Sequence, residues 1–317
     1  MRTVQRSRPH PLVLFLSLSL SLLPCVAPAQ TQSAVAPPFK DELAKQENIY
    51  RDKEEGYAVG YVTDRTLADY ASALPAEFDR SLARLGPEDR WLDIGAGMGQ
   101  AILDYYSPGY DLSHPETAKP NTKKASAVAM SIEDRRTAFW NQAAAHLEPN
   151  KIQYLYEKRL REYSAQELGK FQIITDVIGG FSYTTDLSLF MEKVLGLLAP
   201  GGSFYTVLQD VRAEAGTNKP HYEGDTFLTE IRNAAGTDVG VCRWLKSIGC
   251  VEVTCEYKPD WKPPLEVYRI QKTCNDVAVP RLETVRFAAG TPPERGYRLA
   301  TPPVTTNLTA TSASNTK

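Results

Sequence analysis

Short runs of apolar residues alternate along this chain with longer segments in which apolar residues recur every three or four positions. Short, mostly apolar runs predict buried strands, and they lie at residues 91–94, 127–131, 152–156, 171–177 and 203–208. Between them the apolar spacing is that of helices, at residues 100–106, 133–147 and 187–198. Because strands and helices alternate, the pattern predicts a parallel sheet covered by helices on both faces.

The later part of the chain shows a second pattern. It predicts helices at residues 223–235 and 240–248, followed by two strands at 251–257 and 266–272 that pair antiparallel. No internal repeat is evident. The fold class expected from the whole pattern is therefore α/β, a doubly wound and mostly parallel sheet that ends in an antiparallel hairpin.

The amino-terminal residues 1–29 have the pattern of a signal peptide. Three arginines lie among the first eight residues, an apolar run follows at 12–23, and Ala27-Pro28-Ala29 is a small-x-small cleavage site. The apolar run is shorter than the ~20 residues that a membrane-spanning helix needs. We expect cleavage after Ala29 and a secreted or periplasmic protein without a stable membrane span.

The remaining chain divides into three parts. Residues 30–85 are expected to form a flexible lead-in and an N-terminal helical cap with a break at Pro75, and residues 86–275 the α/β domain. Beyond Cys274 the chain is rich in Pro, Thr and Ala. Residues 276–317 are therefore expected to be a disordered tail.

Charge and cysteine content narrow the function classes. Loss of the signal peptide leaves 33 basic residues against 38 acidic ones, and a mildly acidic chain argues against nonspecific nucleic-acid binding.

None of the four later cysteines forms a C-x-x-C pair, so no metal site is expected. Cys250 and Cys274 flank the predicted hairpin and would lie nearly opposite. Either they form a disulfide or the cysteines are free and buried.

The first strand runs directly into three alternating glycines, in Asp93-Ile94-Gly95-Ala96-Gly97-Met98-Gly99. Glycines after a strand allow a tight turn that approaches a ligand closely. A dinucleotide fingerprint would place its third glycine at position 100, which is Gln100. The spacing therefore disfavours an NAD-dependent oxidoreductase.

Three segments together resemble the class I S-adenosylmethionine-dependent methyltransferases. They are the glycine segment, the strand Phe171–Val177, and Leu197-Leu198-Ala199-Pro200-Gly201-Gly202, and the resemblance covers roughly residues 80 to 273. It implies a Rossmann-like seven-stranded sheet, S-adenosylmethionine as cofactor, and methyl transfer to an unidentified acceptor, expected to be a small molecule. In similar enzymes the N-terminal helical segment lies over the cofactor.

The resemblance also implies roles for particular residues. Asp93 would orient the methionine end of the cofactor, and the loop residues Gly95, Ala96, Gly97 and Gly99 would lie against it. The acid that usually binds the ribose is replaced by Ser131, with Glu133 two residues later. Glu162 is the candidate for the adenine amine, and Asp176 for cofactor or substrate.

His221 is the best-placed candidate for a base, since it follows the fifth strand and a histidine can accept a proton near neutral pH. An alternative function remains open. A noncatalytic, exported protein that binds a ligand or partner on the same fold would explain both Ser131 and the signal peptide. Export conflicts with the enzyme hypothesis, because S-adenosylmethionine is made and kept inside cells.

Overall fold

The computed structural model describes residues 39–51, 53–54, 57–58, 65–106, 124–147, 149–209, 228–261, 264–290 and 292–300. The predicted signal peptide, most of the lead-in and His221 lie outside these residues. Within the described chain no helix is both long enough and apolar enough to span a bilayer.

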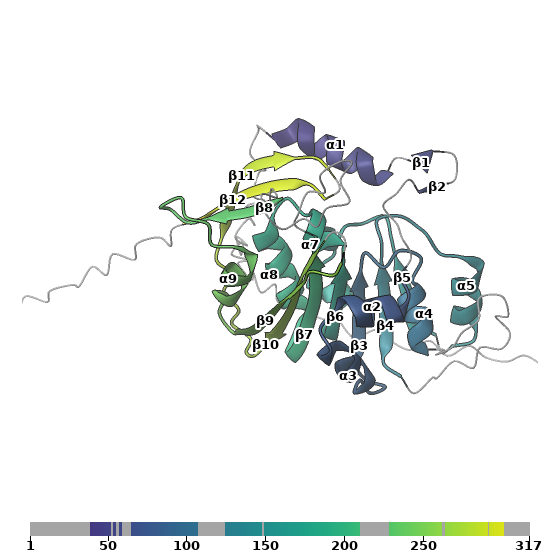
Figure 1. Ribbon diagram of the computed structural model, residues 1–317. Coiled ribbons are helices and arrows are strands. Elements are labelled where there is room, and N and C mark those ends of the chain that lie inside the picture. The colour runs from purple at the N-terminus through teal and green to yellow at the C-terminus, as the bar shows by residue number, and fades with distance from the viewer. Residues whose placement is uncertain are drawn as a thin grey trace, which may run out of the picture. The chain divides into compact units, whose positions relative to one another are not determined.

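A seven-stranded sheet forms the centre of the fold (Figure 1). Its strands run in the order β5-β4-β3-β6-β7-β10-β9, and only β10 is antiparallel to its neighbours. Their bounds are β3 Arg90–Ile94, β4 Ser126–Met130, β5 Ile152–Leu155, β6 Phe171–Val177, β7 Leu198–Leu208, β9 Val251–Lys258 and β10 Leu265–Lys272. The predicted sheet and its final antiparallel pair are confirmed.

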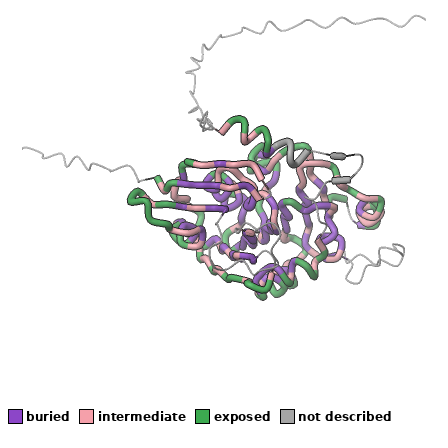
Figure 2. Tube along the Cα trace, turned by 45° about the horizontal axis from the view of Figure 1, so that its top comes forward, coloured by how far each residue is buried: buried purple, intermediate pink, exposed green. Residues whose placement is uncertain are grey.

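Side chains of the central strands enter two separate hydrophobic cores, one on each face of the sheet. In β3, Trp91 belongs to one core, and Leu92 and Ile94 to the other. One core is covered by α2 Leu67–Ala73, α3 Glu77–Ala83, α4 Gln100–Tyr106 and α5 Ala138–Ala145. The other is covered by η3 Leu160–Glu162, α6 Ala165–Leu168, α7 Gly180–Tyr183, α8 Leu187–Leu197 and α9 Val241–Lys246. Figure 2 shows that the buried residues gather in the interior of the fold.

A second sheet of three strands lies beside α7 and α8 (Figure 1). It has the order β11-β12-β8, with β8 Thr229–Arg232, β11 Leu282–Ala288 and β12 Glu294–Leu299. Arg295 of β12 is completely buried, and its guanidinium donates to the carbonyls of Phe181 and Thr184 and to the hydroxyl of Thr229. These bonds attach the small sheet to the loop that follows β6.

Two sequence predictions are wrong in this region. The disordered tail expected for 276–317 is ordered at β11 and β12, because Leu282, Phe287 and Tyr297 are buried there. Residues 301–317 lie outside the described residues. The helix expected at 223–235 is a strand over residues 229–232, since β8 pairs in parallel with β12. A partner so distant in sequence cannot be recognised from local apolar spacing.

All four cysteines of the described chain are paired. Cys250 is joined to Cys274 across the start of β9 and the end of β10, as one of the two alternatives predicted. Cys242 of α9 is joined to Cys255 in the middle of β9, a pairing that the sequence did not suggest. Both disulfides fasten β9, the edge strand of the main sheet.

The N-terminal region is helical, as expected, but also contains a small hairpin. Helix α1 is Lys40–Arg51, and β1 Lys53–Glu54 pairs with β2 Tyr57–Ala58. The side-chain amide of Gln46 exchanges two hydrogen bonds with the backbone of Gly290, which holds α1 against the end of β11. The helices α2 and α3 are separated at Pro75, as predicted.

Candidate functional site

The main sheet reverses its direction of growth between β3 and β6. From β3 the chain proceeds to β4 and β5 on one side, and then returns to place β6 and β7 on the other. Open α/β sheets bind ligands outside the carboxyl ends of their strands at such a point. Asp93 near the end of β3 and Asp176 near the end of β6 both lie there, since Ile94 is paired with Asp176.

The glycine loop Gly95–Gly99 begins at this edge. All three of its glycines have positive φ, at 74° for Gly95, 58° for Gly97 and 86° for Gly99. The amides of Gly95 and Ala96 donate to the carbonyl of Met130, which ties the loop to β4. The loop therefore follows a path that residues with side chains adopt only at a cost.

Packing also requires two of these glycines. A Cβ on Gly99 would lie 2.4 Å from the ring of Trp140, and one on Gly95 would lie 2.9 Å from the Cα of Gly179. The hydroxyl of Tyr154 closes the outer side of the loop by donating to the carbonyl of Gly97 at 2.6 Å. The glycine pattern is thus explained in part by the interior of the protein.

Asp93 is completely buried and is held by hydroxyl groups from two directions. The hydroxyl of Tyr70 in α2 donates to both carboxylate oxygens at 2.9 Å. Thr175 of β6 donates to Oδ1 at 2.7 Å and accepts a hydrogen bond from Trp91 Nε1 at 2.8 Å. These four side chains form one hydrogen-bonded line across the end of β3. Through Tyr70, α2 reaches this edge of the sheet.

Asp176 is also completely buried. Its two oxygens accept hydrogen bonds from the amides of Gly179 and Phe181, at 2.8 and 2.9 Å. Burial raises the pKa of Asp176 to about 7, although these amides act in the opposite direction. The carboxyl group therefore supports the turn into α7, and its oxygens face the protein rather than solvent.

The ends of β4 and β5 carry the remaining predicted residues. Ser131 follows β4 directly, and its amide donates to the carbonyl of Leu155. Glu133 forms an ion pair with Arg135 at 3.1 Å. The carboxylate of Glu162 accepts the amide of Arg159 at 2.6 Å and so closes its own turn. The structure thus brings Ser131 to the edge of the glycine loop, whereas Glu162 is used within η3.

Two further residues of this edge are not predicted from the sequence. Tyr70 is the partner of Asp93. Glu157 comes two residues after β5, is exposed, and has a φ of 72° although it is not a glycine. Backbone strain of this kind is frequent at functional sites. Glu157 could have been found by counting from the strand end, while nothing in the sequence links Tyr70 to Asp93.

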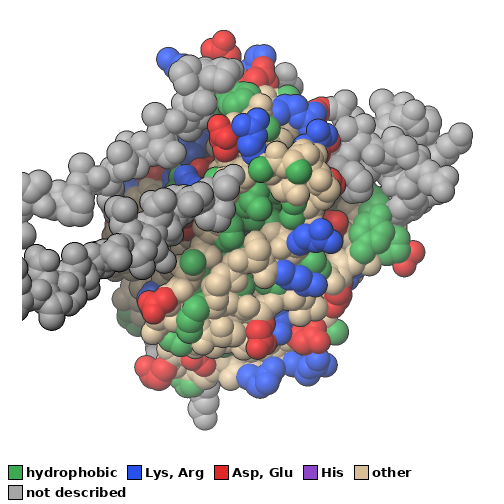
Figure 3. All heavy atoms as spheres, turned by 90° about the vertical axis from the view of Figure 1, so that its left-hand side faces the viewer, with side chains coloured by type: hydrophobic (Ala, Val, Ile, Leu, Met, Phe, Trp, Pro, Cys, Tyr) green, Lys and Arg blue, Asp and Glu red, His purple; other side chains and the backbone are tan. Residues whose placement is uncertain are grey.

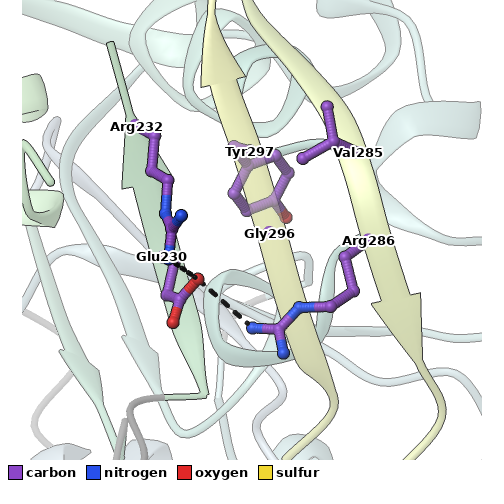
Figure 4. Close-up of a pocket in the computed structure, with 6 residues that line it drawn as sticks. All are labelled: Glu230, Arg232, Val285, Arg286, Gly296 and Tyr297. Atoms are coloured by element: carbon purple, nitrogen blue, oxygen red, sulfur yellow. Dashed lines mark hydrogen bonds and ion pairs between the residues drawn. The ribbon is translucent and has the colours of Figure 1, made fainter. Parts of the chain in front are cut away.

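A groove of about 370 Å³ lies away from this edge, on the three-stranded sheet (Figure 4). Arg286 crosses Gly296 and forms an ion pair with Glu230 at 3.5 Å. Arg232 is also within 3.4 Å of Glu230. On the face shown in Figure 3, acidic and basic side chains are likewise interspersed.

Among the described residues, no cluster of three or more His, Cys, Asp or Glu could hold a metal ion.

The order of the seven strands, with β10 antiparallel, is that of the class I S-adenosylmethionine-dependent methyltransferase fold. No protein-family model matches the chain, and no curated protein is significantly similar to it.

Several solved structures are similar at low identity. A Listeria monocytogenes protein described as an S-adenosylmethionine-dependent methyltransferase is 16% identical, with 62% of this chain and 96% of that one covered and a TM-score of 0.38. The N-methyltransferase NodS from Bradyrhizobium japonicum is 13% identical, with 62% and 93% covered and a TM-score of 0.36.

A Haloferax volcanii protein described as a methyltransferase, in complex with the Trm112 methyltransferase activator, is 18% identical. The match covers 42% of this chain and 51% of that one, with a TM-score of 0.28. This chain thus spans about half the length of the Haloferax protein. Matches at this level identify no substrate and no activity, so the fold assignment rests on the strand order itself.

Proposed function

We propose that this protein binds S-adenosylmethionine at the carboxyl ends of β3 and β6 and transfers its methyl group to a small-molecule acceptor. The observation that carries the proposal is the loop Gly95–Gly99, with three positive φ angles at the reversal point of the sheet. Gly95 is exposed there, so the edge offers backbone that no side chain covers.

The residues present fit this cofactor in part. The glycine loop would lie against its amino-acid end and ribose, Ser131 would offer a hydroxyl to the ribose, and Glu157 would offer a carboxylate to the adenine amine. Once bound, the cofactor supplies a methyl group on a positively charged sulfur. The chain would contribute mainly by holding the acceptor in line with that methyl group, which lowers the barrier through proximity.

We also propose that the protein is exported, as its first 29 residues indicate. The two disulfides support this, because they pair all four cysteines that remain after cleavage. Disulfides form and persist in oxidising compartments and are rare in the cytosol.

The geometry of Asp93 favours a second candidate, a noncatalytic ligand-binding protein. In this structure the carboxylate is completely buried and accepts from Tyr70 and Thr175, and no acid occupies position 131. Both anchors that similar methyltransferases use for the cofactor are therefore altered. A protein of this kind would retain the loop because Gly95 and Gly99 are required by packing.

Calorimetric titration of residues 30–317 with S-adenosylmethionine and S-adenosylhomocysteine tests the proposal. We expect micromolar binding of both ligands. Gly97→Trp should abolish it, because an indole at φ 58° would fill or distort the loop. The matched control is Gly201→Trp, which also changes a glycine of positive φ but lies in open space at the start of β7.

Each outcome distinguishes between the candidates. Binding that is lost only in Gly97→Trp, followed by methyl transfer to an added acceptor, supports the enzyme. Binding without turnover of any acceptor supports the noncatalytic protein. Absence of binding by a folded wild-type chain contradicts the enzyme and favours the noncatalytic protein.

A further inference from the structure

Tyr70 is held in position by both ends of its helix. At the amino end of α2 the amide of Leu67 donates to Asp104 at 2.9 Å. At the carboxyl end Lys258 donates to two carbonyl oxygens, at 2.6 and 2.9 Å. The ring of Tyr70 packs against Phe78, and only 2% of the residue is exposed. The contact with Asp93 therefore belongs to the packed core of the protein.

Tyr70 is the donor of this hydrogen bond. Burial, followed by the charge of Asp93, holds the pKa of Tyr70 well above its usual value. The phenol thus remains protonated and remains a donor. It donates to both oxygens of the carboxylate, and Thr175 donates to Oδ1 as well.

A ligand that carries an ammonium group would compete with this phenol. Hydrogen bonds to a charged partner contribute enough free energy to change affinity about tenfold to a hundredfold. That gain is reduced where a fixed side chain of the same protein already donates to both oxygens of the carboxylate. The nucleoside part of the ligand, which would lie against Ser131 and Glu157, does not meet this competition.

We propose that Tyr70 is a specificity-determining residue, which occupies Asp93 and makes the site recognise adenine nucleoside thioethers by their nucleoside part rather than by their amino-acid end. This inference rests on the proposed cofactor site. It extends that proposal by naming the nucleoside as the part of the ligand that the site recognises, and Tyr70 as the side chain that prevents recognition of the amino-acid end.

Two ligands that differ only in the amino-acid end provide the test. S-Adenosylhomocysteine carries an ammonium and a carboxylate group, and 5′-methylthioadenosine carries neither. Wild-type protein should bind the two with dissociation constants within about threefold of each other. Removal of the phenol in Tyr70→Phe, and of the whole ring in Tyr70→Leu, should strengthen S-adenosylhomocysteine binding about tenfold or more and leave 5′-methylthioadenosine unchanged.

Tyr205→Phe is the matched control. Tyr205 is completely buried in the same core, and its hydroxyl binds Ser81 rather than Asp93. It should therefore leave the ratio of the two affinities unchanged. Unfolding by urea identifies any variant that fails to fold, and the two substitutions at Tyr70 provide independent tests of the same contact.

The possible failures are separable. The inference is overturned if wild-type protein binds S-adenosylhomocysteine about a hundredfold more tightly than 5′-methylthioadenosine. It is also overturned if both Tyr70 variants bind S-adenosylhomocysteine less tightly, relative to 5′-methylthioadenosine, than wild-type protein does, because Tyr70 then assists the amino-acid end. If 5′-methylthioadenosine binds but no Tyr70 variant alters the ratio, the inference alone fails. If neither ligand binds to the folded wild-type protein, the proposed function fails and the inference fails with it.

Discussion

Replacement of Gly99 by alanine should destabilise the protein even in the absence of any ligand. The new Cβ would lie 2.4 and 2.6 Å from two atoms of the Trp140 ring, which cannot retreat easily because it is 97% buried and packs edge-on against Tyr154 at 5.3 Å. The φ of 86° adds a backbone penalty. Left-handed backbone costs about 1 to 2 kcal/mol for a residue with a Cβ.

The magnitude follows from the two terms. Overpacking of a well-filled core costs about 1 to 3 kcal/mol, so Gly99→Ala should lower the free energy of unfolding by about 2 to 5 kcal/mol in total. Gly201→Ala isolates the backbone term, because Gly201 has a φ of 78° and open space around the position of a Cβ. It should cost only about 1 to 2 kcal/mol.

Urea unfolding followed by circular dichroism measures both variants. Equal losses for Gly99→Ala and Gly201→Ala would refute the reasoning, because the contact with Trp140 would then contribute nothing. A double-mutant cycle strengthens the test. In a Trp140→Leu background the excess cost of Gly99→Ala should largely disappear, since the atoms that the Cβ meets are gone. If Gly99→Ala costs more free energy of unfolding than Gly201→Ala, packing against Trp140 is by itself a sufficient reason for a glycine at position 99, whatever ligand the loop binds.

Two further predictions concern stability. The pKa of Asp176 in the folded protein is raised to about 7 from 3.8. The folded state therefore binds the proton more tightly than the unfolded state, and the stability that this gives is fully present below pH 3.8 and is lost as the pH rises through 7. Lowering the pH from 8 to 5.5 should raise the free energy of unfolding by about 2 kcal/mol. Urea titrations should show this gain in the wild type and not in Asp176→Asn; an equal gain in both would assign it to other groups. Replacing Cys250 and Cys274 together by serine should cost about 3.5 kcal/mol by the chain-entropy model, since the disulfide closes a sequence separation of 24. An unchanged urea midpoint would show that this disulfide does not form.

The sequence alone determined the main sheet, because its central strands carry their own signal. A strand covered on both faces is mostly apolar, and such runs at 91–94 and 171–177 became β3 and β6. The glycine loop was recognisable for a similar reason. Its backbone conformation limits the residues that can form it, so the constraint is written in consecutive positions.

The predictions failed where a segment depends on a distant partner. Thr229–Arg232 is too short for its period to separate strand from helix, and it became β8 only because β12 pairs with it 66 residues later. Likewise, the composition of residues 276–317 predicts a disordered tail, although Arg295 of β12 binds the backbone of α7. Pairing energy of this kind does not appear in any local window.

The same distinction holds for the site: the sequence determined where its acidic residues lie, and the tertiary structure determined what they contact. The sequence placed Asp93 and Asp176 at the ends of adjacent strands, since a parallel sheet brings such ends together. Only the tertiary structure decided what their carboxylates contact. Tyr70 covers Asp93 and two backbone amides hold Asp176, because helix packing and loop closure set these contacts after the sheet has formed.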